Sequence, residues 1–321
     1  MRPKGITDEQ FIEVWNRLGS PTLVAKELNL SIRNCQERRS KLNLETWNDT
    51  SVRRKVIKSH EGRIDLTIEK GTIIVFSDAH FWPNVRTTAF RGLLALIKQL
   101  KPVAIICNGD AFDGGTISKY PRIGWDNKPT VKEEIDAVTS FLWEIYQTGR
   151  EIGCSTFCWP LGNHDARFET KLASAAPQFE GVKGFALKDH FVEWKPCWTT
   201  WINDETCITH FYHTGLHDTH NNVLKAQVNY ISGHTHSLKW TPWTDATGHT
   251  KYGVNTGTLA NALDSHNADY QQGRHGNHRS GFAVLTYRDY KLQMPELVSV
   301  WDEDTIEFRG HLLDADTGEI V

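Results

Sequence analysis

The chain has 321 residues, of which 39% are hydrophobic and 11% aromatic, and this composition supports a large packed core. No stretch approaches the ~20 consecutive apolar residues of a transmembrane helix, and the start "MRPKGITDEQF" lacks the apolar segment of a secretory signal. The six cysteines are scattered, and several lie in apolar, strand-like runs, as expected of reduced and buried thiols. We therefore expect a cytoplasmic protein that does not interact with a membrane.

The net charge of −3 conceals an uneven distribution of charge along the chain. Residues 1–60 contain 12 Lys and Arg against 7 Asp and Glu, a balance of +5. The remaining residues contain 24 basic and 32 acidic side chains, a balance of −8. A basic first segment joined to an acidic body is a pattern that any functional assignment has to explain.

The first predicted elements are three short helices that resemble a helix-turn-helix. Ala25 stands where two helices would pack closely, Asn29 in the tight turn, and Ser31 at the cap of the third helix. We expect a small all-α, nucleic-acid-binding module over residues 1–45 and a basic linker over residues 46–61. The alternative is a helical hairpin that serves folding, a protein partner or oligomerisation. In the nucleic-acid interpretation the third helix enters the major groove, and the residues expected to contact DNA are Arg33, Asn34, Gln36, Arg38 and Arg39.

From residue 62 onward the pattern changes to strands alternating with helices, which predicts an α/β domain over residues 62–321. Residues 63–78 and residues 281–301 each have the pattern of a hairpin. The longest amphipathic helix is predicted over residues 130–153, and several short apolar runs between the hairpins predict buried strands. In such a layout the chemistry lies at the carboxyl ends of the strands.

Five of the predicted strands end in side chains that bind metal ions. Any one of these strand ends could be an ordinary polar turn, but five of them in one chain are very hard to obtain by chance. The residues are Asp78 and His80 in "SDAH", Asp110 and Asp113 in "GDAFD", Asn163, His164 and Asp165 in "GNHD", His213 in "HTG", and His234 and His236 in "GHTH".

In this order the motifs resemble those of the calcineurin-like metallophosphoesterases, from about residue 70 onward. The resemblance implies an α/β fold, namely an αββα sandwich of two mixed sheets flanked by helices, and a site for two divalent cations. Carried over by position, the roles are Asp78, His80 and His236 for the first cation, Asn163, His213 and His234 for the second, and Asp110 as the bridge between them.

The fourth motif is the loosest match, because His210 lies in the same predicted strand as His213. The two residues are three positions apart, so in an extended strand their side chains point to opposite faces. We favour His213 as the ligand, since it stands at the strand end beside the glycine turn.

The donor set suits borderline divalent ions, and we expect two Mn²⁺ ions, with Fe, Zn or Ni as alternatives. Two such ions can share a water molecule and lower its pKa, which supplies hydroxide at neutral pH. We expect His164 to stabilise or protonate the leaving oxygen and Asp165 to accept the other N–H of its imidazole. Asp113 is expected to support His80.

The motifs also bear on the substrate. "GDAFDGG" lacks the arginine that serine/threonine protein phosphatases carry in this motif, and it looks more like the nuclease and phosphodiesterase branches. "SDAHFWP", "GNHDARFE", "GTLA" and "SGFAVLTY" resemble phage-type members, for which the location would be the host cytoplasm. The side chains with a possible substrate contact are Arg167, Trp82, Tyr120 and Arg274.

We therefore expect a dimetal phosphodiesterase or nuclease that its basic first module brings to nucleic acid. One alternative is a phosphomonoesterase or cyclic-nucleotide phosphodiesterase whose first module serves oligomerisation. Another is a non-catalytic DNA-binding regulator. The sequence leaves the oligomeric state open.

Overall fold

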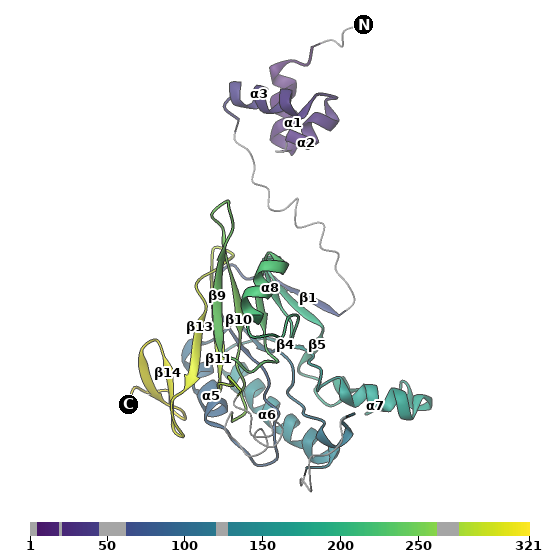
Figure 1. The fold of residues 1–321 in the computed structure, drawn as a ribbon, viewed down its shortest axis with the longest axis vertical. Helices are drawn as coiled ribbons and strands as arrows, with labels where there is room; N and C mark the ends of the chain where they lie inside the picture. Colours follow the sequence, from purple (N-terminus) through teal and green to yellow (C-terminus); the bar gives the residue numbers. More distant parts are fainter. Residues whose placement is uncertain (1–4, 19–20, 45–61, 120–127, 262–275) are drawn as a thin grey trace. The chain divides into compact units, whose positions relative to one another are not determined.

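A computed structural model describes residues 5–18, 21–44, 62–119, 128–261 and 276–321. The chain divides into two compact units, Met1–His60 and Glu61–Val321 (Figure 1). Among the described residues, no helix combines the length and the apolar character needed to span a bilayer.

The first unit contains three short helices, α1 (Asp8–Leu18), α2 (Pro21–Glu27) and α3 (Ile32–Lys41). Ser31 begins α3 by accepting a hydrogen bond from the backbone N–H of Asn34, and Asn29 turns the chain with a left-handed φ of 53°. These are the capping and turn positions that the sequence predicts. The helices share a small apolar core of Phe11, Trp15, Val24, Ala25 and Cys35.

The second unit is built around two mixed β-sheets. Among the described residues, nine strands form one sheet in the order β15-β14-β13-β11-β2-β3-β4-β5, with β12 paired to β11. Its strands are β2 (Gly71–Phe76), β3 (Ala104–Cys107), β4 (Thr156–Pro160), β5 (Lys195–Cys197), β11 (Gly281–Arg288), β12 (Lys291–Leu292), β13 (Glu296–Val300), β14 (Thr305–Phe308) and β15 (His311–Asp314). Six strands form the other sheet in the order β1-β6-β7-β8-β10-β9. These strands are β1 (Arg63–Leu66), β6 (Thr199–Ile202), β7 (Thr206–Ile208), β8 (Asn229–Ser232), β9 (Lys239–Thr244) and β10 (Thr250–Asn255).

Helices α5 (Thr88–Leu100) and α6 (Val131–Glu151) cover the outer face of the larger sheet, and α8 (Asp218–Ala226) covers that of the smaller sheet. Helix α7 (Arg167–Ala175) packs instead against short 3₁₀ turns; such turns lie at Gly115–Ile117, Pro177–Phe179 and Leu187–Asp189. The side chains of β2 show how the layers pack, because they alternate between two apolar cores. Ile74 and Phe76 join the core that α5 and α6 cover, whereas Ile73 and Val75 join the core between the two sheets. Because both faces of β2 are buried, its sequence is a continuous apolar run. The predicted αββα sandwich is confirmed.

One predicted hairpin is wrong and the other is confirmed. Within residues 63–78, β1 and β2 do not pair, because β1 pairs with β6 in one sheet and β2 pairs with β3 and β11 in the other. The Asn203 side chain fixes the crossing between the sheets by bonding both the N–H and the C=O of Ile68. Within residues 281–301, β11 and β13 do pair in antiparallel fashion.

Candidate metal centre

The candidate site lies where five strands of the two sheets end. The neighbouring strands β2, β3 and β4 run parallel, so their carboxyl ends meet at one edge of the larger sheet. Strands β7 and β8 of the smaller sheet are also parallel neighbours, and they end at the same place. The polar motifs of the sequence follow these five strands directly, which is why residues far apart along the chain come together.

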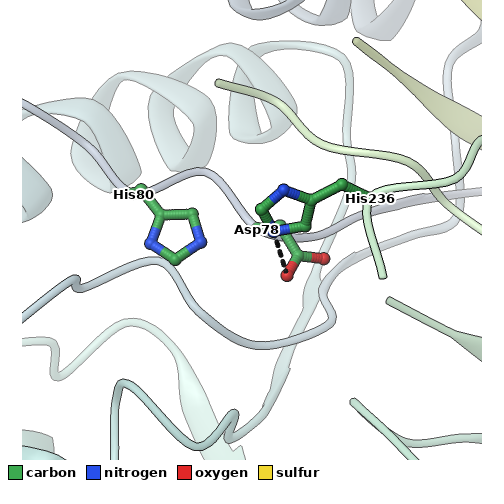
Figure 2. A group of neighbouring side chains, drawn as sticks. All are labelled: Asp78, His80 and His236. Carbon is green, nitrogen blue, oxygen red and sulfur yellow. Dashed lines mark ion pairs between the residues drawn. The ribbon is translucent and has the colours of Figure 1, made fainter. Parts of the chain in front are cut away.

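The first group of side chains consists of Asp78, His80 and His236 (Figure 2), and their potential ligand atoms lie within 4.8 Å of one another. Asp78 is completely buried, and its Oδ1 lies 3.1 Å from Nε2 of His236. The three side chains come from the loops after β2 and β8. They are the three residues predicted for the first cation, although their role as ligands stays a prediction.

The second group consists of Asp110, His210 and His234, again within 4.8 Å of one another. Nε2 of His210 lies 3.0 Å from Oδ2 of Asp110 and 3.8 Å from Oδ1 of Asp78, so the two groups adjoin. Asp110 itself lies between β3 and the "GNHD" loop, where its Oδ1 accepts the backbone N–H of His164 at 2.8 Å. This central position is the one that a bridging carboxylate requires.

The structure favours His210 over His213 in the fourth motif, because His210 lies with Asp110 and His234 in the second group, and the choice of ligand between them stays a prediction. β7 ends at Ile208, and the buried His210 lies two residues further along, where its Nδ1 bonds the C=O of Asn108 at 2.7 Å. His213 is not in either group; its backbone N–H bonds the side chain of Asn222, and its ring lies against Tyr212. The sequence analysis favoured His213 because it placed the end of the strand later than Ile208.

The carboxylates of both groups are ionised although they are buried. Burial by itself would raise their pKa values, but the charges of His236 and His210 hold the pKa of Asp78 at about 2. His210 likewise holds the pKa of Asp110 below its usual range, and the pKa of His210 rises to about 10 against the effect of burial. The charge of each buried carboxylate is therefore balanced by neighbouring histidines.

The backbone around these side chains is unusual. Asp78, His80, Asp110, His234 and His236 all adopt left-handed φ angles, of 52°, 40°, 53°, 67° and 54°. Residues other than glycine rarely adopt such angles, and each one costs free energy that the surrounding structure must offset.

Glycines allow the loops to approach one another closely. A Cβ atom on Gly162 would overlap the carboxylate of Asp110, and one on Gly233 would overlap Ser77 and the carboxylate of Asp78. The glycines of "GNHD" and "GHTH" are therefore required by the close approach of loop to carboxylate.

Comparisons with known proteins agree with this geometry. A family profile described as "Calcineurin-like phosphoesterase" matches residues 71–275, more than half of the chain. The chain belongs to the calcineurin-like phosphoesterase family. It is therefore a metal-dependent phosphoester hydrolase.

Solved structures of low similarity were also found. A predicted phosphoesterase from Streptococcus pneumoniae TIGR4 is 14% identical with a TM-score of 0.27, covering 79% of this chain and 94% of its own. A dimetal phosphatase from Danio rerio is 10% identical with a TM-score of 0.35, covering 72% and 96%. A purple acid phosphatase from yellow lupin (Lupinus luteus) seeds is 11% identical with a TM-score of 0.35, covering 82% and 54%. No curated protein matches the chain, so the assignment depends on the family profile.

The donor atoms fit the pair of divalent cations expected in this family. Oδ1 of Asn163 and Nδ1 of His236 are buried, and each lacks a hydrogen-bond partner in the described part of the chain. Buried polar atoms without partners are costly, so such atoms beside ionised carboxylates indicate that a cation completes the site. Carboxylate, amide and imidazole donors without thiolates are typical of Mn²⁺, Fe²⁺ or catalytic Zn²⁺ sites.

His164 is oriented by Asp113, which corrects the prediction that Asp165 does so. Nδ1 of His164 lies 2.9 Å from Oδ1 of Asp113, and the same oxygen lies 3.2 Å from Nδ1 of His80. The contact that the sequence analysis expected between Asp113 and His80 is thus present. Asp113 and Asp110 raise the pKa of His164 against the effect of burial, and Arg167 lowers it.

Asp165 has a structural role instead. It is completely buried and accepts the backbone N–H groups of Asp110, Phe112 and Gly162 at 2.8–3.0 Å. It also accepts the indole N–H of Trp159. Asp165 therefore ties the "GDAFD" loop to the "GNHD" loop, and it makes no contact with the imidazole of His164 among the hydrogen bonds of the described residues.

The predicted substrate contacts have different outcomes. Arg167 lies within the site, since its guanidinium donates to Nε2 of His164 at 2.9 Å and to the C=O of Asp113 at 2.8 Å. Trp82 is partly buried in the loop after β2. Tyr120 and Arg274 lie outside the described residues. The sequence analysis missed two exposed aromatic residues, Phe211 and Tyr212, which directly follow His210; their position after a strand end was the only available signal.

The predicted DNA contacts on α3 also differ from one another. The side chain of Arg33 is 84% exposed, and Asn34 and Gln36 are exposed as well. Arg38 instead folds back onto α1, where it donates to Asp8 at 2.8 Å and to the C=O of Ile6 at 2.7 Å. Arg38 is thus used to hold the helices together, and Arg39 is only partly exposed.

Proposed function

We propose that the protein is a phosphodiesterase that uses two divalent cations, with Mn²⁺ as the expected metal, to hydrolyse nucleic acid. Asp78, His80 and His236 would hold one cation, and Asn163, His210 and His234 the other, with Asp110 between them. When bound, such a cation pair lowers the pKa of a shared water molecule and neutralises charge on the phosphoryl oxygens.

The remaining chemistry comes from the side chains beside the cations. Asp113 accepts the Nδ1–H of His164, which leaves Nε2 as the ring nitrogen that can deliver a proton to the leaving oxygen. Arg167 donates to that same Nε2. A phosphoryl oxygen is a stronger acceptor for the guanidinium, so substrate binding would draw Arg167 away and free Nε2 for protonation.

The observation that supports nucleic acid as the substrate is the basic first unit. Residues 1–60 carry a balance of +5 on a chain whose remainder is acidic. On α3 they present the exposed Arg33, Asn34 and Gln36. An acidic catalytic unit repels a polyanion at long range, and a basic module offsets that repulsion.

A substrate panel tests this proposal. The purified full chain with Mn²⁺ is assayed on bis-(p-nitrophenyl) phosphate, on p-nitrophenyl phosphate, and on single-stranded and double-stranded DNA. We expect turnover of the diester and cleavage of DNA. Turnover of the monoester alone would overturn the proposal in favour of a phosphomonoesterase, and metal binding without any turnover would favour a non-catalytic regulator.

A further inference from the structure

Two neighbouring aromatic side chains lie exposed beside the metal centre. Phe211 is 46% and Tyr212 is 54% exposed, and both belong to the segment between β7 and α8. Exposed apolar groups are common one at a time, but two consecutive exposed aromatic residues that directly follow a residue of the site indicate a binding surface. The proposed hydrolysis does not use either ring.

Phe211 and Tyr212 are each supported by another ring. The ring of Phe211 lies 5.2 Å from that of His234 with 37° between their planes, and its centroid is 5.8 Å from that of His210. The ring of Tyr212 lies 4.4 Å from that of His213 and 5.8 Å from that of Tyr230. The exposed surface of Phe211 is therefore only one ring away from the second group of metal ligands.

The segment is also fixed in place by hydrogen bonds at several points. The backbone N–H of Gly233 donates to the C=O of His210 at 2.8 Å, and that of His213 donates to the side chain of Asn222 at 2.9 Å. Nζ of Lys239 donates to the C=O of Leu216 at 2.8 Å. Because the backbone is held at both ends of the aromatic pair, the rings are in position before a substrate arrives, which lowers the entropic cost of binding.

We propose that Phe211 and Tyr212 form a stacking platform for a nucleobase next to the phosphate that is cleaved. This inference rests on the proposed function and narrows it to nucleic acid with unpaired bases. Every base has a π-face, so an aromatic platform binds bases without regard to sequence. A base inside a duplex is already stacked between its neighbours, and it would have to leave the helix to reach the platform. Single strands, loops and ends are therefore the preferred substrates.

The test compares an oligothymidine single strand with an abasic oligonucleotide of the same length, using the full chain with Mn²⁺. The variants are Phe211→Ala, Phe211→Leu, which keeps apolar bulk without a ring, and Tyr212→Ala. The matched control is Tyr290→Ala, because Tyr290 is 47% exposed and follows β11 at the opposite end of the sheet, near the start of β2. Metal content and thermal unfolding are measured for each variant.

Removing the ring of Phe211 is expected to lower kcat/KM for the oligothymidine by about 5- to 150-fold relative to the abasic strand, the fold-change that corresponds to the roughly 1–3 kcal/mol of one stacked base. The loss should lie in KM, since the platform holds the base equally in the ground and transition states. Phe211→Leu should behave like Phe211→Ala, and Tyr290→Ala like the wild type.

Three results would overturn the inference in distinguishable ways. If the wild type cleaves both strands equally and Phe211→Ala does not change their ratio, the platform is wrong while the proposed nuclease activity stands. If the wild type hydrolyses bis-(p-nitrophenyl) phosphate but neither oligonucleotide, the proposed function fails and the platform fails with it. A loss confined to kcat with reduced metal content would show that Phe211 only supports His234.

Discussion

Replacing the buried Glu134 with glutamine should change how the stability of the protein depends on pH. Glu134 is 1% exposed in α6, and its carboxylate accepts the backbone N–H groups of Gly114 at 2.8 Å and Gly115 at 3.3 Å. Burial, followed by the charge of Asp113, raises its pKa to about 7, compared with an ordinary value of 4.5. The residue therefore fixes the turn that follows Asp113, the carboxylate that orients His164.

The sign of the effect follows from which state holds the proton. Between pH 4.5 and 7 the folded protein keeps a proton on Glu134 that the unfolded chain has already lost. The stabilising contribution of this group is thus complete below pH 4.5 and is lost as the pH rises through 7. A shift of roughly 2.5 pKa units corresponds to about 3 kcal/mol in the free energy of unfolding. The side-chain amide of the Glu134→Gln variant has no such proton to release.

The assay is urea unfolding of the full chain in the presence of a chelator, at pH 5 and at pH 8, for the wild type and for Glu134→Gln. The free energy of unfolding of the wild type relative to the variant should fall by about 3 kcal/mol between the two pH values. Glu151→Gln, at the exposed end of the same helix, is the control and should show no such change. A difference that stays constant with pH would refute the reasoning.

Three further predictions concern the metal centre and the first unit. His210→Ala should remove about one of two bound metal ions and abolish turnover, whereas His213→Ala should keep both ions. Metal content is measured by mass spectrometry. The reverse result would make His213 the ligand. His164→Ala should keep its metals and lose ~10²–10⁴-fold in turnover. Asp113→Asn should lose ~10–100-fold in turnover. Loss of metal from His164→Ala would show that His164 is a metal ligand. Deleting residues 1–60 should weaken DNA binding and flatten its salt dependence while sparing hydrolysis of a small diester, and unchanged DNA affinity would exclude the delivery role.

The convergence of the metal-binding motifs could be predicted because it depends on where strands end in a parallel sheet. Parallel strands place their carboxyl ends at one edge, and the short polar motifs after β2, β3 and β4 therefore had to meet there. That the motif after β8 of the other sheet joins them was implied by the family resemblance. No contact between distant residues was needed for that inference.

The remaining features depend on contacts that a sequence does not display. His210 could be chosen over His213 only once the end of β7 at Ile208 was known. Asp165 was given a catalytic contact because it follows His164, but its partners are backbone N–H groups of two loops. The hairpin at 63–78 was wrong because β1 and β2 find their partners in strands distant in sequence, β6 for β1, and β3 and β11 for β2.

The left-handed backbone at Asp78, His80, Asp110, His234 and His236 has a consequence for any attempt to re-engineer the metal preference of this enzyme. Asp and Asn tolerate that conformation far better than Glu or β-branched side chains. Exchanges between Asp and Asn at positions 78 and 110 would thus alter the charge of the site while preserving its frame, whereas a longer carboxylate would distort it. Selection in a directed-evolution experiment should accordingly recover changes in the residues around the ligands more often than changes in the ligands themselves.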